Sequence, residues 1–512
     1  MSITSINNSF NLFARLFESR KATEPIIKWR SEKPLLTDEP ISSPLPRALP
    51  EETGIPSGVI ADFLTDLKND PTLDMHTVLF VKNGAVIASA EFGEHSMGIP
   101  KYVFSASKSV TALAIGMLID DGKLSMNEKL VDIFGDLTNT ISKLRLRDVT
   151  VETLLTMRSC SIFNEVSSMT TPDWQSEFMK SLTRGTVNTD FNYNSLNTYM
   201  LAAIVRRKTG KGLVEYLTPR LFEPLDIKNI YWEKSPEGIE KGGWGLYIRP
   251  EDFAKIGLMV QNGGTWNGKR LISSVWLEQA VSPHATPPPA ECGDFNYGYQ
   301  IWTGRRANTF LFNGMLGQNL LCFRSSGLII VSNAGNDESF QQSNYFRYAL
   351  KHFGKPFSAS LQPDSAAVSR LESVIRDIKD PHFPAATGKQ RLLSRLFARR
   401  QPTPLDSFLG VTFTADDEVA PSTGLMPKML QAFENNYSEG FVSFTIEKSG
   451  AEKDDEFIIT VVEADETHRF TAGENRYIRT GIDFHGQKYL VASAVRAAKD
   501  EDGFDVLTLD IL

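Results

Sequence analysis

The sequence is poor in cysteine, in long apolar runs and in net positive charge. Its three cysteines, Cys160, Cys292 and Cys322, are odd in number and widely spaced, which argues against a disulfide framework and against a cysteine metal site. No apolar run approaches the roughly 20 residues that a membrane-spanning helix needs. The N-terminus lacks the uninterrupted apolar core of a secretory signal. We therefore expect reduced thiols and a cytoplasmic protein.

Positive charge is scarce, since the formal net charge is -8 at pH 7. A chain without a basic field lacks the long-range attraction that drives binding to nucleic acid or to anionic membranes, so neither partner is expected. Residues 403–512 hold 21 acidic and 9 basic side chains, for which a solvated face is a simpler explanation than an acidic docking surface. The histidines, such as His76, His95 and His284, do not cluster, so no metal site and no cofactor are expected.

Length and composition predict two domains with connecting segments. Residues 1–50 form the expected N-terminal extension, because closely spaced prolines in its second half interrupt regular structure. Residues 51–355 and residues 403–512 are the expected folded domains. Residues 356–402 between them have the composition of a linker.

Local patterns in residues 51–355 predict strands at both ends and helices between them. Asn83-Gly84 separates two β-rich stretches within residues 77–92, a hairpin signal because both turn residues tolerate positive φ. Helices are predicted at Ser105–Asp121 and Leu196–Lys208, each followed by a glycine that suits a helix stop. Strand patterns return in three stretches, residues 295–302, 319–323 and 327–333. This order predicts an α/β (α+β) fold, in which distant segments complete one sheet and a helical subdomain is inserted between them.

The C-terminal domain shows a different pattern. Short alternating stretches, FVSFTIE, EFIITVVE, KYLVASAV and DVLTLDIL, are separated by turn residues. Alternation of this kind predicts a small all-β sandwich or barrel.

A candidate nucleophile lies at the start of the first predicted helix, in the segment FSASKSVTALAIGMLIDDGKLS. Ser105 and Lys108 are three residues apart and therefore share a helix face, so the lysine amine can reach the serine hydroxyl. A serine hydroxyl is a weak nucleophile until a base takes its proton, and burial can lower the pKa of a lysine enough for that role. The tetrapeptide alone is a weak signal, because about two Ser-x-x-Lys matches are expected by composition.

A series of segments in order resembles the serine β-lactamase and penicillin-binding superfamily, especially its class C, esterase and nylon-oligomer hydrolase branch. The resemblance covers about residues 55 to 355 and includes the hairpin, the Ser105 segment, VTVETLLTMRS and GGWGLYIRPEDFAKIGLMVQNGGTWNGKRLIS. It implies an antiparallel sheet flanked by helices and a serine hydrolase that forms an acyl-enzyme on Ser105 without a cofactor. The tail resembles the lipocalin-like domains of some relatives, which implies covering of the active site or homo-oligomer assembly.

Two further family motifs supply site residues by resemblance. FNYNSLNTYML provides Tyr193, which shuttles the proton, and Ser195 two residues later. Because a phenol normally titrates near 10, the role of Tyr193 requires adjacent positive charge, which Lys108 can provide. LFNGMLGQNLLCF provides Gly314, after which the backbone N–H of Met315 becomes the second oxyanion donor beside that of Ser105.

This sequence departs from the family pattern at two positions. Phe312 stands two residues before Gly314, where relatives carry a cation that binds a substrate carboxylate, so β-lactam hydrolysis and wall-peptide cleavage are not favoured. Cys160 stands where relatives carry a glycine, and an altered turn explains it more simply than a reactive thiol.

The expected reaction is cleavage of a small-molecule ester or amide by acyl transfer through Ser105. A peptidase acting on D-amino-acid or related small peptides is an alternative within the enzyme class. A non-catalytic scaffold with this fold is the alternative outside it. Retention of Ser105, Lys108 and Tyr193 together favours the enzyme, because a scaffold does not need all three.

Overall fold

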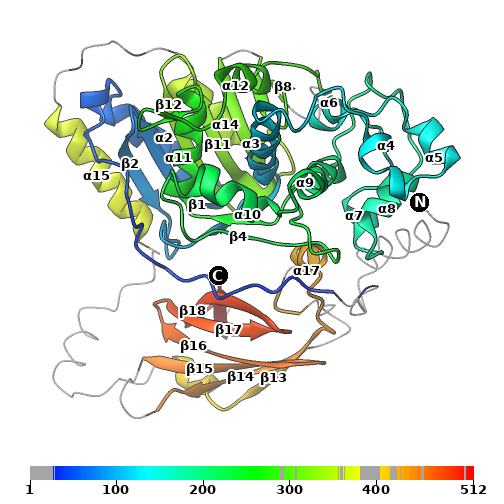
Figure 1. Cartoon of the computed structure of the whole chain (residues 1–512). Helices are drawn as coiled ribbons and strands as arrows, with labels where there is room; N and C mark the ends of the chain where they lie inside the picture. The colour runs from blue at the N-terminus through cyan, green and yellow to red at the C-terminus, as the bar shows by residue number, and fades with distance from the viewer. Residues whose placement is uncertain are drawn as a thin grey trace. The chain divides into compact units, whose positions relative to one another are not determined.

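The computed structural model describes residues 29–288, 293–305, 308–355, 364–380, 404–415, 424–426, 428–450, 455–500 and 503–512, with residues 27, 357 and 361. The chain divides into two compact units (Figure 1). Among the described residues, 38–379 belong to the first unit, and 27–37 with 380–512 belong to the second.

The first unit is built on one antiparallel sheet of seven strands in the order β2-β1-β12-β11-β10-β9-β8. The strands are β1 (Met75–Lys82), β2 (Ala85–Glu91), β8 (Phe295–Tyr297), β9 (Trp302–Gly304), β10 (Thr309–Gly314), β11 (Gln318–Phe323) and β12 (Leu328–Ala334). Strand β1 pairs with β12, with Val78 opposite Ser332. The prediction that early and late segments complete one sheet is confirmed.

Local sequence patterns predicted one turn of this sheet and missed another. The predicted hairpin is present, because Asn83 and Gly84 both adopt positive φ, 53° and 78°, between β1 and β2. The single strand predicted at residues 295–302 is wrong, since this stretch forms β8 and the start of β9. Gln300 between them has a φ of 59°, and its side-chain amide donates to the carbonyls of Leu154 and Leu155.

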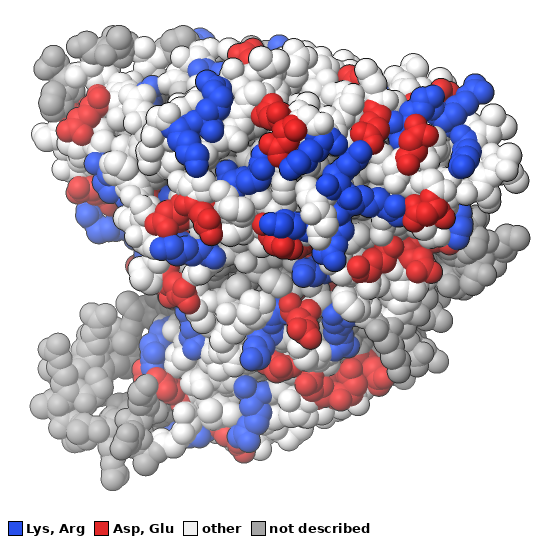
Figure 2. Space-filling view, viewed as in Figure 1, with Lys and Arg blue, Asp and Glu red and all other residues white. Residues whose placement is uncertain are grey.

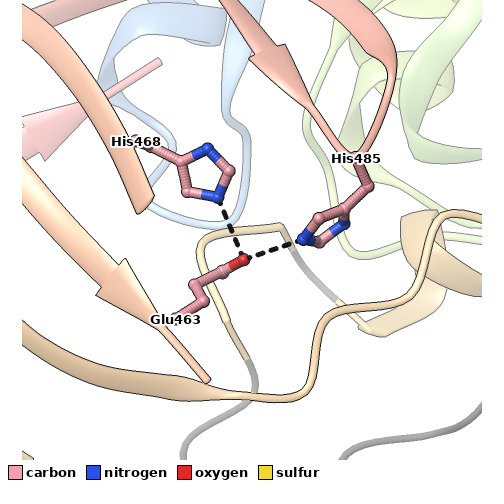
Figure 3. A group of neighbouring side chains, drawn as sticks. All are labelled: Glu463, His468 and His485. Carbon is pink, nitrogen blue, oxygen red and sulfur yellow. Dashed lines mark hydrogen bonds and ion pairs between the residues drawn. The ribbon is translucent and has the colours of Figure 1, made fainter. Parts of the chain in front are cut away.

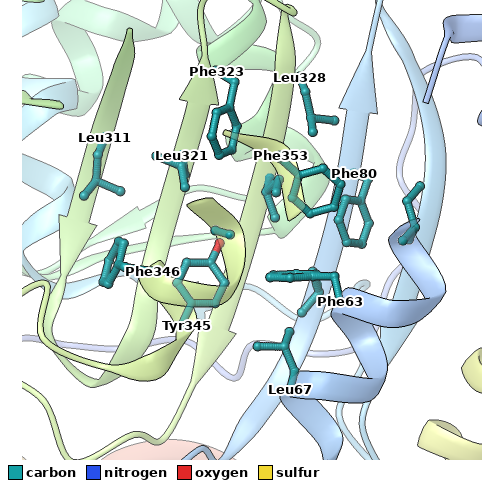
Figure 4. Close-up of a cluster of buried hydrophobic side chains, with 14 of the residues drawn as sticks. Phe63, Leu67, Phe80, Leu311, Leu321, Phe323, Leu328, Tyr345, Phe346 and Phe353 are labelled. Carbon is teal, nitrogen blue, oxygen red and sulfur yellow. The ribbon is translucent and has the colours of Figure 1, made fainter. Parts of the chain in front are cut away.

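Helices cover both faces of the sheet, because neighbouring strand residues point to opposite sides. On one face, α2 (Ser57–Asn69) and α14 (Asn344–Phe353) bury Phe63 and Phe353 against Phe80 of β1 (Figure 4). On the other face lies α11 (Pro250–Gln261), whose Gly257 approaches Leu320 so closely that an added Cβ would lie 2.8 Å from its methyl carbons.

The inserted helical region lies between β2 and β8. Its central helix, α3 (Ser107–Asp120), is buried at every position from Ser107 to Leu118 and packs against α9 (Ser195–Thr209). The remaining helices of this region are α4 (Leu130–Ile133), α5 (Thr140–Arg145), α6 (Val151–Leu155), α7 (Glu165–Ser168), α8 (Trp174–Lys180), α10 (Leu213–Leu217) and α12 (Ser274–Ala280). A small sheet of β3 (Lys101–Tyr102), β5 (Leu246–Ile248) and β4 (Tyr231–Trp232) adjoins them.

Segments outside the predicted domain borders take part in this unit. The backbone N–H of Leu45 donates to Glu251, and Arg47 pairs with the same carboxylate at 2.7 Å. Helix α15 (Ser365–Lys379), inside the predicted linker, packs on α2. Residues 381–402 of that linker lie outside the described residues.

The second unit is all-β apart from short helices, as predicted. Its strands are β13 (Thr412–Thr414), β14 (Phe441–Lys448), β15 (Glu456–Glu463), β16 (Thr467–Glu474), β17 (Ile478–Phe484), β18 (Gln487–Lys499) and β19 (Asp505–Ile511). They pair in the order β13-β14-β15-β16-β18-β17, and β19 pairs with β18. Residues 29–37 belong to this unit, where Gln487 donates to the carbonyl of Ser31 at 2.8 Å and Lys33 lies 3.4 Å from Glu434 in α17 (Lys428–Glu434).

The described residues also show the hydropathy of the helices and the charge on one face of the molecule. No helix among them is both long enough and apolar enough to span a bilayer. On the face drawn in Figure 2, Lys and Arg side chains lie among Asp and Glu side chains, separated by uncharged residues.

Candidate active site

Ser105 lies in a short 3-10 turn, η2 (Phe104–Ala106), immediately before α3. Phe104 adopts a φ of 44°, which is unusual for a residue with a side chain. The hydroxyl of Ser107 holds this turn, because it donates to the Phe104 carbonyl at 2.6 Å and accepts from the Leu246 N–H at 3.3 Å. The turn leaves Ser105 partly exposed while the helix behind it is buried.

Lys108 is positioned against Ser105 as the i, i+3 spacing predicts. Its Nζ lies 2.8 Å from the Ser105 Oγ, 2.8 Å from the Ser195 Oγ and 2.8 Å from the Gly243 carbonyl oxygen. The residue is only 1% exposed. The structure thus brings Ser195 and Gly243, which are distant in sequence, to the amine that contacts the predicted nucleophile.

Burial lowers the pKa of the Lys108 ammonium to about 7, and the negative charge of Glu165 opposes part of that shift. Water is excluded from the amine, and the atoms that bind it are two hydroxyls and a carbonyl, none of which carries a charge. A substantial fraction of Lys108 is therefore neutral at neutral pH, which is the protonation state that a base requires.

The contacts of Lys108 also direct its lone pair. A neutral amine has two N–H donors and one acceptor site. The Gly243 carbonyl can only accept, so one N–H points to it, whereas the hydroxyls of Ser105 and Ser195 can donate or accept. The arrangement in which Ser195 accepts and Ser105 donates places the lone pair on the Ser105 proton. Proton removal from Ser105 then needs no rearrangement of heavy atoms.

Tyr193 lies beside this group. Its ring centroid is 4.8 Å from the Lys108 Nζ, and the ring stacks on Trp302 at 5.7 Å and contacts Phe340 edge-on at 5.2 Å. The aromatic contacts fix the ring, and the residue remains partly exposed. Tyr193 thus contacts Lys108 through the face of its ring, and its proton-transfer role stays a prediction.

The predicted oxyanion segment lies next to the nucleophile turn. Gly314 ends β10 directly against the residue before Phe104, so an added Cβ would lie 2.2 Å from the Val103 carbonyl oxygen. Only glycine allows this approach, which brings the partly exposed Met315 to the Ser105 turn. Phe312 is buried and packs against Phe253 of α11 at 5.9 Å, so this strand position presents no cation to the site.

Two residues of the site were missed by sequence reasoning, Glu165 and Gly243. Glu165 accepts a hydrogen bond from the Ser195 N–H at 2.6 Å and so holds the start of α9 near Lys108. Gly243 packs so closely on α9 that an added Cβ would lie 2.7 Å from the Ser195 carbonyl oxygen. The Gly-Gly-Trp-Gly run was a usable signal for Gly243, whereas a lone Glu165 in a polar loop carried none.

Cys160, at the position of a family glycine, has a φ of 54°. This left-handed conformation suits glycine, which explains the usual residue there. Burial, with the nearby Asp190 carboxylate, raises the pKa of the Cys160 thiol, so the sulfur is not activated as a nucleophile.

Comparison with known proteins matches residues 72–349, more than half of the chain, to the family described as Beta-lactamase. The chain belongs to the beta-lactamase family. This family member is 28% identical over 248 residues to a 6-aminohexanoate-dimer hydrolase of Paenarthrobacter ureafaciens. The alignment covers 43% of this chain and 62% of that protein, so the chain spans less than two thirds of the length of this relative.

The fold of this beta-lactamase family member is also similar to a solved structure. That structure is a candidate 6-aminohexanoate-dimer hydrolase from Bacillus anthracis, with a TM-score of 0.51 and 17% sequence identity, covering 69% of this chain and 95% of that one. At this identity the likeness concerns the fold alone. It agrees with the predicted antiparallel sheet flanked by helices.

Proposed function

We propose that the chain is a serine hydrolase that cleaves an ester or amide bond of a small molecule through an acyl-enzyme on Ser105. The observation that carries this proposal is the 2.8 Å contact between the Ser105 hydroxyl and the buried Lys108 amine, whose pKa burial lowers to about 7. Family membership supports a hydrolase, and the curated relative is named for cleavage of the 6-aminohexanoate dimer, whose two units are joined by an amide.

Acylation begins when neutral Lys108 removes the Ser105 proton. The Ser105 Oγ forms a bond to the substrate carbonyl carbon, and the carbonyl π electrons move onto its oxygen. The backbone N–H groups of Ser105 and Met315 stabilise this oxyanion, a role that the close approach of Gly314 to the nucleophile turn supports. When the intermediate collapses, the C–O or C–N bond breaks and the leaving group takes a proton.

Tyr193 transfers this proton in the proposed mechanism. The ring lies against the Lys108 ammonium at 4.8 Å, and a nearby positive charge favours ionisation of a phenol. The Tyr193 hydroxyl gives its proton to the leaving alcohol or amine and regains one from Lys108. In deacylation a water molecule attacks the ester carbon and loses a proton to the same pair. The bond between this carbon and the Ser105 Oγ then breaks, the pair returns the proton to Oγ, and the acid leaves.

The site favours substrates whose recognition does not depend on a carboxylate near the strand. Phe312, at the strand position where the family resemblance implies a cation, is fully buried against Phe253 and offers no positive charge to a substrate. We therefore expect neutral acyl groups to be accepted more readily than β-lactams or wall peptides with a free carboxylate. The substrate is proposed to be a small ester or amide.

A cytoplasmic location remains part of the proposal. Cys160 and Cys322 are free, buried thiols, which suits a reducing compartment. Assembly of a homo-oligomer through the second unit stays a prediction.

The test is covalent labelling with a fluorophosphonate probe, followed by hydrolysis of p-nitrophenyl esters and anilides of rising chain length. Wild type should be labelled once and turn over, and Ser105→Ala should lose both. Ser125→Ala is the matched control, because Ser125 is exposed and lies outside the site. A folded wild-type chain that neither labels nor turns over any substrate would contradict the proposal and favour the scaffold.

A further inference from the structure

A group of acidic and histidine side chains gathers at one end of the second unit (Figure 3). Glu463 ends β15, His468 lies in β16, and His485 lies in the turn between β17 and β18. Glu463 and His468 are buried, and the His485 side chain is 7% exposed. The prediction that the histidines do not cluster is wrong. His468 and His485 come together here although they are 17 positions apart, and the rings of His76 and His95 stack at 3.8 Å in the first unit.

The spacing of the polar atoms matches one bound cation. The Nε2 of His468 lies 3.1 Å from the Glu463 Oε2, and the Nε2 of His485 lies 3.3 Å from the same oxygen. All three ligand atoms lie within 4.8 Å of one another. Zinc binds nitrogen and oxygen at about 2.0 to 2.2 Å, and a tetrahedron of that size places its ligands about 3.3 Å apart.

Both imidazole rings are oriented as in metal sites. The Nδ1 of His468 lies 3.2 Å from the Asp483 carbonyl oxygen, which can only accept, so this nitrogen carries the hydrogen. The Nδ1 of His485 lies 3.0 Å from the Asn436 side-chain oxygen. A neutral ring then turns its Nε2 lone pair toward Glu463. Acceptors at Nδ1 that orient the ligand nitrogen are typical of zinc-bound histidine.

A backbone hydrogen bond also orients the Glu463 carboxylate. The Oε1 of Glu463 accepts from the Leu425 N–H at 2.7 Å, which leaves Oε2 to face the two rings. Two lone pairs and an anionic oxygen that converge on one point repel each other unless a cation lies between them. The site is therefore complete only with bound protons or with a metal ion.

Nearby carboxylates favour a metal ion over bound protons. Asp465 and Glu466 each place an oxygen 3.4 Å from the His485 Nε2, so either can be a fourth ligand. The Arg30 side chain also lies at this turn, where it donates a hydrogen bond to the backbone carbonyl of His485. With neutral rings the three carboxylates carry a net charge that a divalent ion compensates better than a single proton.

We propose that Glu463, His468 and His485 bind one divalent transition-metal ion with the ligand chemistry of Zn²⁺, completed by Glu466 or Asp465. The ion joins the ends of β15 and β16 to the β17–β18 turn, and its role is structural. It lies in the second unit and takes no part in the chemistry proposed at Ser105.

The experiment uses the untagged full-length chain, stripped of metal with a chelator and dialysed. Zn²⁺ is then titrated by calorimetry, bound metal is counted by mass spectrometry, and Co²⁺ is added as a spectroscopic probe. We expect one Zn²⁺ per chain, a higher Tm with Zn²⁺, and the absorption of tetrahedral Co²⁺ with nitrogen and oxygen ligands.

Variants assign the ion to these residues. His468→Gln and His485→Gln should each weaken Zn²⁺ binding at least about a hundredfold. His284→Gln, which alters a first-unit histidine stacked on Tyr299, should bind as wild type does. Absence of stoichiometric Zn²⁺ in wild type, or tight binding that persists in both site variants, would overturn the proposal. If the variants do not fold, the wild-type stoichiometry and Co²⁺ spectrum decide it, and fluorophosphonate labelling of the metal-free chain tests Ser105 independently.

Discussion

Two buried lysines of the first unit, Lys108 and Lys255, face very different partners. Both residues are 1% exposed. The Nζ of Lys255 lies 2.9 Å from an Asp252 carboxylate oxygen, and Arg249 pairs with the same carboxylate at 2.7 Å. The Nζ of Lys108 lies among two serine hydroxyls and a backbone carbonyl.

The difference shows that the nearest partners, and not burial alone, determine what a buried lysine can do. A carboxylate at hydrogen-bonding distance stabilises the ammonium form and makes the lysine a structural cation. Hydroxyls and a carbonyl satisfy the hydrogen-bonding capacity of either form, so the cost of burying charge favours the neutral amine. Lys108 can therefore act as a base on Ser105, whereas Lys255 holds the start of α11.

The largest effect is expected for Lys108→Met. This change removes the proposed base and keeps an unbranched side chain of similar length, so kcat/KM should fall by about 10⁴-fold. Steady-state ester hydrolysis measures the loss, and an unchanged circular dichroism spectrum shows that the fold is intact. Retention of more than a tenth of wild-type activity would mean that another group deprotonates Ser105.

A carboxylate placed beside Lys108 should convert it toward the Lys255 type. Ser195→Asp introduces a negative charge next to the Nζ and should raise the pKa of Lys108 from about 7 to about 9, which lowers the neutral fraction, and with it kcat/KM at pH 7, about fiftyfold. Ser195→Asn is the matched neutral control and should keep the wild-type pH profile. Equal profiles for the two variants would show that charge at this position does not control the amine.

The pH dependence of wild type follows from the lowered pKa of Lys108. Because the proposed base is the unprotonated amine, the rate of probe labelling should rise with pH, about tenfold per unit below pH 7, and level off above it. Rates measured with Ser105→Ala provide the background. An inflection near the ordinary lysine pKa, or a rate that falls as pH rises through 7, would contradict the assignment.

The smallest effect on activity is expected for Lys255→Met. Asp252 would lose one of its two buried cations, so the free energy of unfolding should fall by about 2 kcal/mol, measured by urea denaturation. Activity per folded molecule should stay within about twofold of wild type. The control is Lys228→Met, which removes an exposed ion pair and should change stability little.

The features predicted from sequence were those that depend on short-range rules. Asn83-Gly84 specified a hairpin, and the three-residue spacing of Ser105 and Lys108 placed both on one helix face. The order of strand and helix patterns was enough to predict that early and late segments of the first unit form one sheet. The roles of Ser105, Lys108, Tyr193, Ser195, Gly314 and Met315 remain predictions that the geometry supports.

Features that depend on contacts between distant segments were not predicted. Gly243 reaches Lys108 across 135 positions, and the Gly-Gly-Trp-Gly run marks a tight backbone there without indicating that its carbonyl binds the lysine. Glu165 accepts from the backbone of Ser195 and places a negative charge near Lys108, from a loop position that no local pattern marks. His468 and His485 share no spacing rule, because the strand pairing that joins them is set by apolar alternation elsewhere in the second unit.

The pairing of residues 29–37 with the second unit makes that unit discontinuous along the chain. A ribosome releases the whole first unit before it releases the strands on which Ser31 and Lys33 pack. The first unit can thus fold during synthesis. The second unit can fold only when its C-terminal strands have been made and can pack on residues 29–37. Truncation of the N-terminal residues would damage the C-terminal fold and leave the hydrolase fold intact. A circular permutant that joins residue 512 to residue 29 would remove this delay.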